Sequence, residues 1–275
     1  MKAKKHPMSL VQRALVYASA VIVFGVLLAL IVYILVMGVP NLKLSLFAWS
    51  YNSENLSMLP AIINTLTMIA LTLLMAVPFG IGAAIYLVEY AKRGSRLVKL
   101  VRLTAETLSG IPSIVYGLFG YLMFVLTCGM DNSMLAGALT LAIMVLPTIL
   151  RTTEEALQAV PDSFREGSFG LGAGKLRTVM RIVLPAAVPG IFSGIVLAIG
   201  RVVGETAALI YTAGTVTGVA DGLLGSGRTL AVHLYCLLNE GLYTKEAYAT
   251  AVILLVLVIG INALSSAVAK KLARR

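Results

Sequence analysis

Long apolar runs, separated by short polar segments, occupy most of this chain. Six of the runs are long enough to cross a membrane as helices, because a spanning helix needs about 20 apolar residues. They cover approximately residues 15–37, 61–90, 104–127, 134–150, 183–213 and 247–268. The pattern predicts an all-α polytopic membrane protein with six transmembrane helices.

The first apolar run follows a basic segment, Met1 to Arg13, which is also how a secretory signal begins. The apolar part of a signal is only about 7 to 15 residues long, so the longer run here predicts a retained helix. Near the other end, Thr229 to Leu238 is apolar but too short to span a membrane. It predicts a re-entrant or interfacial helix.

The composition excludes a soluble globule. Hydrophobic residues make up 59% of the 275 residues, charged residues 12%, and the mean hydropathy is +0.94. Soluble proteins are about 45 to 50% apolar and about 25% charged, so this chain has too few polar side chains to cover a soluble surface. A net charge of +10 would suggest nucleic-acid binding in a soluble protein. Here the basic residues lie between the apolar runs, which indicates membrane topology and no nucleic-acid partner.

The placement of the basic residues predicts the orientation. Counted over alternate loops, eighteen Lys and Arg residues lie on one side of the membrane and three on the other. Cytoplasmic loops retain positive charge, so we expect both termini in the cytoplasm. The expected organisation is an N-terminal tail, first helix and outer loop over residues 1–60, a transmembrane domain over 61–268, and a basic cytoplasmic tail over 269–275.

Residues suited to catalysis or metal binding are scarce. The chain has two cysteines, Cys128 and Cys236, and two histidines, His6 and His233. Their spacing matches no metal site, and two cysteines are too few for a disulfide framework. Whether the two cysteines pair stays open. We expect no catalytic residue, no metal and no cofactor in this chain.

The most informative polar segment lies between the fourth and fifth apolar runs, at residues 160–182. Asp162 or Ser163 can cap a helix that begins after Pro161, and a cluster of glycines would end that helix. The residue types alone are equally compatible with a solvated loop. The segment predicts either a short helix followed by a turn or no regular structure.

The same segment carries a signature. Glu166-Gly167-Ser168, three residues, Gly172, nine residues and Ile182-Val-Leu184-Pro185 match the pattern E-A-A-x3-G-x9-I-x-L-P at every spacing. The chain thereby resembles the permeases of binding-protein-dependent ABC importers. Gly and Ser replace the two alanines, which keeps the small size that lets another surface approach, although both are poorer helix formers. The resemblance implies the type I, MetI-like permease fold and a coupling helix, within 160–182, that seats in a groove of an ATPase subunit.

Two membrane segments, Pro112–Gly120 and Arg201–Gly214, resemble the phosphate branch of these permeases, the PstA-like subunits; the resemblance covers about residues 60–268. It implies an importer of inorganic phosphate in a bacterial or archaeal inner membrane. The implied partners are a PstC-like second permease, a PstB-like ATPase dimer and an extracytoplasmic PstS-like phosphate-binding protein. Another oxyanion, such as sulfate or molybdate, stays open because the coupling signature does not report the substrate. A secondary transporter or channel is the alternative from a different class.

A nucleotide site in this chain is not expected. Gly170 to Lys175 resembles the end of a phosphate-binding P-loop, G-x-x-x-x-G-K-[ST]. Phe169 and Leu176 occupy two of the defining positions, and no strand precedes the segment. ATP is therefore expected to be bound by the partner ATPase.

Arg201 and Glu205 are the ionisable residues deepest in an apolar run. Counted from Pro189 at about 1.5 Å per residue, Arg201 lies about 18 Å into a core of about 30 Å. A spacing of four would place both residues on one face of a continuous helix. Charges at this depth are costly and usually face a cavity or a partner. We expect Arg201 to supply positive potential to an anion pathway and Glu205 to temper it; the alternative is a pair that only neutralises itself.

Three weaker patterns concern helix geometry and packing. Gly110-Ile-Pro112 interrupts the third run and predicts either backbone exposed to a cavity or a packing kink. Arg102 and Glu106, four residues apart, predict an interfacial ion pair. The small-xxx-small spacing of Gly190, Gly194 and Ala198, and then of Gly200 and Gly204, predicts close contact with a neighbouring helix.

Overall fold

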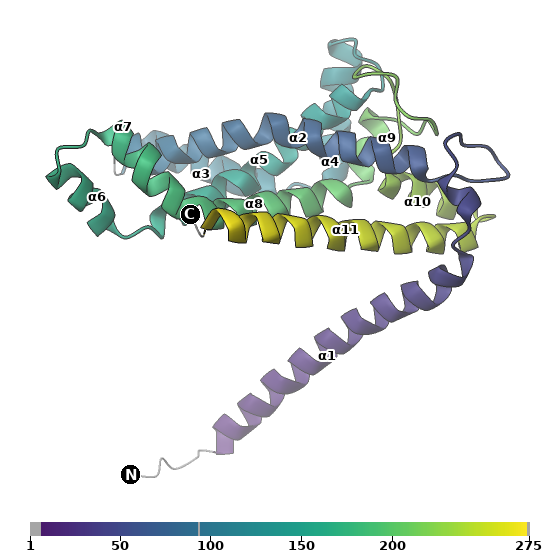
Figure 1. Cartoon of the computed structure of the whole chain (residues 1–275), viewed down its shortest axis with the longest axis horizontal. Helices are drawn as coiled ribbons and strands as arrows, with labels where there is room; N and C mark the ends of the chain where they lie inside the picture. Colours follow the sequence, from purple (N-terminus) through teal and green to yellow (C-terminus); the bar gives the residue numbers. More distant parts are fainter. Residues whose placement is uncertain (1–6, 93, 274–275) are drawn as a thin grey trace.

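The computed structural model describes residues 7–92 and 94–273, with side chains described for 12–92 and 94–267. Every regular element in these ranges is helical. Figure 1 shows a bundle whose long helices lie side by side: α2 (Leu59–Ile85), α5 (Met134–Gln158), α8 (Leu184–Val203) and α11 (Thr244–Ala273). The first six residues of the basic N-terminal tail and the last two of the C-terminal tail lie outside the described residues.

Helix α1 (Pro7–Gly38) diverges from this bundle (Figure 1). It contacts α11 through its last turns, where the Tyr33 and Tyr248 hydroxyl oxygens are 3.1 Å apart. The rest of α1 is apolar, and 0% of its most apolar window is buried in this chain. Its surface is therefore available to lipid or to a neighbouring protein.

In the described residues, five helical segments are long and apolar enough to cross a membrane, and one bent pair makes a sixth candidate. The five are Gln12–Asn41, Leu59–Tyr90, Met134–Gln158, Lys175–Val203 and Thr244–Ala267. The all-α membrane fold expected from the sequence is confirmed. The cytoplasmic location of both termini stays a prediction.

Helix α5 is the centre of the bundle. It packs along both α2 and α8, and 67% of its most apolar window is buried. Small residues of α8 permit this contact, because a Cβ added at Gly190 would lie 2.6 Å from the Cβ of Ala156, and one at Gly194 would overlap Thr152. The close packing predicted from the spacing of small residues is confirmed at Gly190 and Gly194 but not at Gly200, where an added Cβ would meet no atom of the chain within 4 Å.

The third apolar run, expected as one span at 104–127, is broken at Gly110-Ile-Pro112, where the sequence predicted an interruption. Helix α3 (Arg96–Ser109) is followed by α4 (Ser113–Gly120), and a π-helical stretch extends α4 to Thr127. The two parts meet at 102°. Pro112 has no N–H to donate and disfavours the helical conformation in the residue before it, so the helix ends here and the chain turns. The hydroxyl of Tyr116 donates to the Leu108 carbonyl across the break (2.7 Å).

The fifth apolar run is also broken, which the sequence pattern did not predict. Helix α8 ends at Val203, and Gly204–Thr206 separate it from α9 (Ala207–Thr212). Helix α9 packs against α4 so closely that a Cβ added at Gly117 would lie 2.8 Å from the Ala208 Cα. Two interrupted helices thus meet inside the bundle. Such an arrangement is tolerated in membranes where the freed backbone groups face protein or a cavity.

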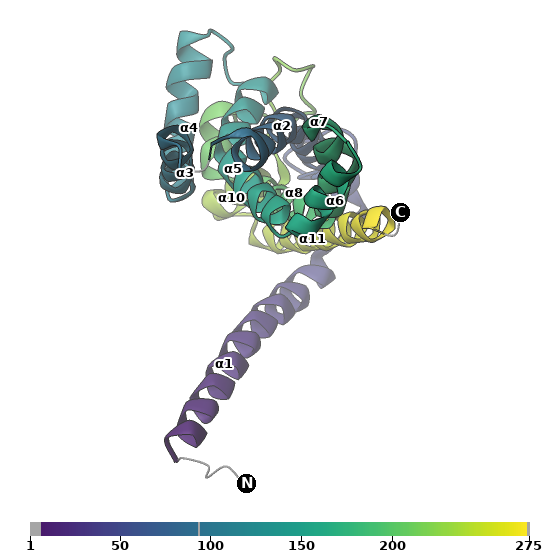
Figure 2. The same cartoon turned by 90° about the vertical axis from the view of Figure 1, so that its left-hand side faces the viewer.

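The bundle has two ends, which we name the α6 end and the α10 end. The α6 end carries α6 (Asp162–Gly170) and α7 (Lys175–Thr178), and the α10 end carries α10 (Leu230–Glu240) and the loop that follows α1 (Figure 1). Figure 2 views the molecule from the α6 end, with α6 and α7 in front of the long helices and α3 and α4 to one side. Helix α10 is the short helix expected near residues 229–238.

Candidate functional site

Residues 160–182 form a helix, a turn and a second helix, which continues through a π-helical stretch into α8. Pro161 precedes α6, and Asp162 lies in its first turn, where a carboxylate stabilises the helix N-terminus. In the turn, the Gly172 amide donates to the Phe169 carbonyl (2.9 Å) and the Ala173 amide donates to the Ser168 carbonyl (3.1 Å). Of the two alternatives left by the sequence, the helix and turn are therefore present.

The signature residues are divided between the projecting helix and the bundle. Glu166 and Gly167 are exposed on α6. Ile182 and Leu184 are half-buried, and Pro185 is exposed at the start of α8, just after the π-helical stretch Val179–Val183 from which the helix continues. The first part of the signature can thus meet another protein, whereas the last part joins the segment to the bundle.

Ser168 does not face outward, which corrects its expected place on the exposed surface of the signature. Its side chain is buried, and its hydroxyl oxygen lies 2.8 Å from that of Thr178 on α7. This hydrogen bond ties α6 to α7. The neighbouring Gly167 remains open, since a Cβ added there would meet no atom of the chain within 4 Å.

Gly172 has a φ of +80°, a conformation that side-chain-bearing residues rarely adopt. No atom lies within 4 Å of an added Cβ, so within this chain the constraint is conformational. We expect Gly172→Ala to destabilise the turn by about 1 kcal/mol and to speed proteolytic cleavage within residues 160–182. Gly167→Ala is the matched control, because Gly167 is equally exposed but helical. Equal cleavage rates for the two variants would contradict the assigned role of the left-handed conformation.

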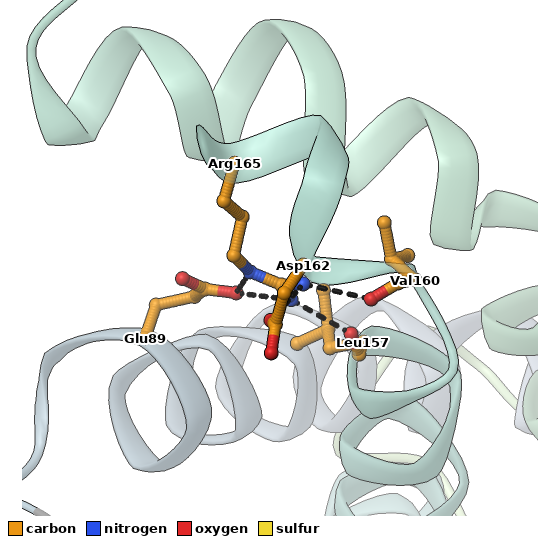
Figure 3. Close-up of polar contacts among 5 residues, drawn as sticks. All are labelled: Glu89, Leu157, Val160, Asp162 and Arg165. Atoms are coloured by element: carbon orange, nitrogen blue, oxygen red, sulfur yellow. Dashed lines mark hydrogen bonds and ion pairs between the residues drawn. The ribbon is translucent and has the colours of Figure 1, made fainter. Parts of the chain in front are cut away.

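Arg165 anchors α6 to the bundle, and no sequence pattern identified it. Its Nε and Nη2 donate to Oε1 of Glu89 at 3.1 and 2.8 Å. Glu89 lies in the π-helical stretch Tyr86–Tyr90 that continues α2. The same guanidinium donates to the Asp162 carboxylate and to the carbonyls of Leu157 and Val160 (Figure 3). We name these five residues the Arg165 clamp.

The ion pair between Arg165 and Glu89 is largely shielded from water, whereas the Asp162 side chain is 72% exposed. The Arg165 side chain is 15% exposed and that of Glu89 is 8% exposed. An ion pair in such a place is expensive to break, because either partner alone would be a buried charge. The clamp therefore fixes the direction in which α6 projects from the bundle.

The projecting segment also exposes large apolar side chains. Phe164, Phe169, Leu171 and Leu176 are between 47% and 92% exposed, and all four belong to α6, α7 or the turn between them. Outside a membrane, neighbouring exposed apolar residues are typical of a surface that another protein covers.

Arg201 and Glu205 do not share a helix face, which corrects the expected pairing. Arg201 is half-buried in the last turn of α8, whereas Glu205 lies in the break after Val203. The Glu205 carboxylate is buried and accepts a hydrogen bond from the Ala208 amide at the start of α9 (3.1 Å). Among the described residues, no ion pair joins Arg201 to any carboxylate. Arg201 lies near Tyr116 of α4, so its charge is beside the point where the two broken helices meet.

The ion pairs between α3 and α5 also differ from the expected pair of Arg102 with Glu106. Arg102 pairs with the buried Glu154, and Glu106 pairs with Arg151 at 3.7 Å. Partners on the neighbouring helix replace the intrahelical one, because α3 packs directly on α5. These two pairs connect α3, the first half of the broken third span, to α5.

Within residues 12–92 and 94–267, whose side chains the structure describes, no group of three or more His, Cys, Asp or Glu side chains lies together. Cys128 and Cys236 are both free.

Comparisons with known proteins agree with this arrangement. Residues 76–275 match the family described as binding-protein-dependent transport system inner membrane component. The chain is 32% identical over 238 residues to a probable ABC transporter permease, YqgI, of Bacillus subtilis, with 81% of each chain covered. It is 36% identical over 210 residues to the phosphate transport system permease protein PstA of Mycobacterium leprae, covering 75% of this chain and 68% of that protein. The PstA of Yersinia pestis is 38% identical over 205 residues, covering 72% of this chain and 68% of that protein.

Solved structures show the same fold at lower identity. A chain of the MetNI methionine ABC transporter, in an inward-facing conformation, aligns with a TM-score of 0.60 at 19% identity, covering 78% of this chain and 93% of that one. A bacterial alginate ABC transporter, in complex with an alginate-bound periplasmic protein, aligns with a TM-score of 0.62 at 17% identity, covering 92% and 95%. The chain therefore belongs to the inner membrane components of binding-protein-dependent transport systems and is a PstA-like permease of an ABC importer.

Proposed function

We propose that this chain is the transmembrane permease subunit of an ATP-driven importer of inorganic phosphate. The observation that carries the proposal is the α6–α7 segment, which bears the coupling signature and projects from the bundle of a chain similar to named phosphate permeases. The chain forms half of the translocation pathway, and it lies in a bacterial inner membrane.

Coupling to ATP hydrolysis occurs through α6. Its exposed residues, Glu166 and Gly167, together with the apolar side chains around them, meet a groove of a PstB-like ATPase subunit. The Arg165 clamp transmits the motion of α6 to α2, because Glu89 belongs to the stretch that continues α2. Ile182, Leu184 and Pro185 transmit it to α8 through the continuous helical connection. ATP is bound and hydrolysed by the partner.

The phosphate pathway passes Arg201. Phosphate carries between one and two negative charges near neutral pH, and it loses water when it enters a narrow cavity. A guanidinium replaces part of that hydration with charge-assisted hydrogen bonds. Arg201 is suited to this role, because it is half-buried and no carboxylate of the described chain neutralises it. Glu205 instead positions the start of α9.

Two further partners complete the importer. A PstC-like permease supplies the other half of the pathway and covers apolar surface that this chain leaves exposed. A PstS-like phosphate-binding protein delivers phosphate at the α10 end. This assignment places the α6 end in the cytoplasm, in agreement with the distribution of basic residues.

Purification of the tagged chain from its native membrane in a mild detergent tests this function. We expect a second permease and an ATPase to co-purify in stoichiometric amounts. The double variant Glu166→Lys/Phe164→Asp in α6 should lose the ATPase and keep the second permease. A chain that purifies alone and moves phosphate without ATP would be a secondary transporter, and the proposal would fail.

The proposed orientation predicts a labelling pattern. In a chain with Cys128 and Cys236 replaced by serine, Ser163→Cys on α6 should react with a membrane-impermeant maleimide only after the cells are opened. Ser53→Cys, in the loop after α1, should react in intact cells. Both positions are exposed, so accessibility within the chain does not limit either reaction. Labelling of Ser163→Cys in intact cells would reverse the orientation.

A further inference from the structure

At the α10 end, a guanidinium is buried without a partner. Arg228 is 3% exposed and directly precedes the N-cap of α10. Its Nε and Nη2 make no hydrogen bond within the described chain. The face of the guanidinium lies over the ring of Tyr51, with 4.7 Å between Cζ and the ring centroid. An aromatic face attracts the charge from one side, but it leaves the N–H groups of Nε and Nη2 unpaired.

Two neighbours of Arg228 also have buried polar atoms without a hydrogen-bond partner. The hydroxyl of Thr229 has no hydrogen-bond partner, and neither has any ring nitrogen of His233. Both side chains are at most 1% exposed. The His233 ring also meets Tyr51 edge to face, with ring centroids 6.2 Å apart. Unpaired polar atoms are rare in protein interiors, and here several belong to one junction between loop and helix.

The edge of Arg228 formed by Nε and Nη2 is unpaired, whereas the same edge of Arg165 is paired. Arg165 uses the same two nitrogens, Nε and Nη2, to bind an oxygen of Glu89. That edge of a guanidinium is a planar fork that matches the oxygens of a carboxylate or a phosphate. No acidic side chain pairs with Arg228 in the described chain. Its fork is therefore shaped for an oxyanion that the chain does not itself provide.

The backbone around Arg228 is firmly held. Asn64 of α2 donates to the carbonyls of Gly218 (2.9 Å) and Arg228 (3.2 Å), and it accepts from the Ala220 amide (3.0 Å). The Leu230 amide donates to the Thr65 hydroxyl (2.8 Å). These contacts, two of them buried and two partly buried, fix the junction against α2. The cluster is thus preorganised, which lowers the cost of binding a ligand.

The electrostatics of the junction favour an anion. The first amides of α10 have no acceptor within their own helix, and the helix dipole adds positive potential at this end. Burial, reinforced by the charge of Arg228, lowers the pKa of His233 to about 3. The imidazole is therefore neutral at physiological pH, and one of its nitrogens can donate.

We propose that Arg228, Thr229 and His233 form a second anion site, which binds one small tetrahedral oxyanion of the phosphate class. Two oxygens of the anion accept from the Arg228 fork, and the others accept from the Thr229 hydroxyl and the His233 ring. Tyr51 seals the cluster in this structure, so binding requires the loop after α1 to lift. The binding of the anion is independent of the proposed function; only the placement of the site on the outer side, ahead of Arg201, rests on it.

The full-length chain carrying Arg201→Gln, purified in detergent, tests the site without the pathway arginine. Its thermal unfolding is followed while potassium phosphate or potassium sulfate replaces potassium chloride at constant ionic strength. We expect both oxyanions to raise the melting temperature saturably by about 2 to 4 °C. Adding Arg228→Met should abolish the rise, and Arg228→Lys should reduce it. Trp49 is the one tryptophan of the chain and lies in the Tyr51 loop, so its fluorescence should change over the same concentration range.

If Arg228→Met does not fold, the site is tested with Thr229→Val and His233→Phe, which keep the guanidinium. Each should lower the affinity of the chain for phosphate several-fold. The inference is overturned if phosphate and sulfate act no differently from chloride, or if Arg228→Met keeps the full rise. Phosphate uptake by the wild-type complex is measured separately. A rise in melting temperature without any uptake would refute the proposed function and leave the anion site supported. Normal uptake without a rise in melting temperature would support the proposed function and refute the anion site.

Discussion

Replacement of Arg201 by glutamine is expected to lower phosphate uptake about 10- to 100-fold, with the abundance of the complex unchanged. The range corresponds to the loss of a hydrogen bond to a charged group, about 1.5 to 3 kcal/mol. Glutamine keeps a polar side chain, although a shorter one, and carries no charge. Because no carboxylate of the described chain pairs with Arg201, its removal leaves no acidic side chain without a partner. Initial uptake rates and complex abundance are measured on the same membranes.

Two further variants sharpen this test. Arg201→Lys should restore part of the uptake, because it returns the charge without the planar fork. Glu205→Gln should keep most of the uptake, since its amide oxygen can still accept from the Ala208 amide. Glu205→Ala removes that acceptor and should weaken the start of α9. Wild-type uptake by Arg201→Gln, or loss of uptake only through loss of the complex, would place the pathway elsewhere.

Replacement of Arg165 by methionine is expected to disconnect ATP hydrolysis from transport. The change leaves the Glu89 carboxylate buried without its partner, at a cost of about 3 kcal/mol, and it frees α6 from the end of α2. We expect ATPase activity that no longer depends on substrate delivery, together with uptake reduced at least about tenfold. Both rates are measured on one reconstituted complex.

The double variant Arg165→Met/Glu89→Leu separates stability from coupling. It removes the unpaired carboxylate, so melting temperature should recover, whereas coupling should stay impaired because α6 is still not anchored. Arg177→Met on α7 is the matched control, since Arg177 is exposed and forms no ion pair in the described chain. An unchanged ratio of phosphate moved to ATP hydrolysed in Arg165→Met would rule out the clamp as the coupling contact.

Much of the fold could be predicted because apolar run length reports membrane spans directly. The runs near 61–90 and 247–268 correspond to helical spans at nearly the expected residues. The coupling signature likewise predicted α6, since Pro161 and the glycines after Phe169 mark where that helix begins and ends. These features depend on residues close together in sequence.

Prediction from the sequence was wrong or incomplete where the structure depends on contacts between residues distant in sequence, or where a helix breaks without a proline. Glu205 was placed on the face of Arg201 because Gly204 alone did not indicate that α8 ends at Val203. Arg165 and Glu89 are 76 residues apart, so no spacing rule could join them. Arg228 could not be singled out from the sequence, because its burial results from packing of the α10 end.

The central claim is that this chain carries phosphate in an ATP-driven complex, and substrate competition tests it most directly. The complex is reconstituted in proteoliposomes with its ATPase, second permease and binding protein, and uptake of radiolabelled phosphate is measured with and without ATP. The account predicts uptake that requires ATP, is suppressed by unlabelled phosphate, and is unaffected by equal sulfate or molybdate. ATP-driven uptake of sulfate or molybdate in place of phosphate, or phosphate uptake that proceeds equally without ATP, would contradict it.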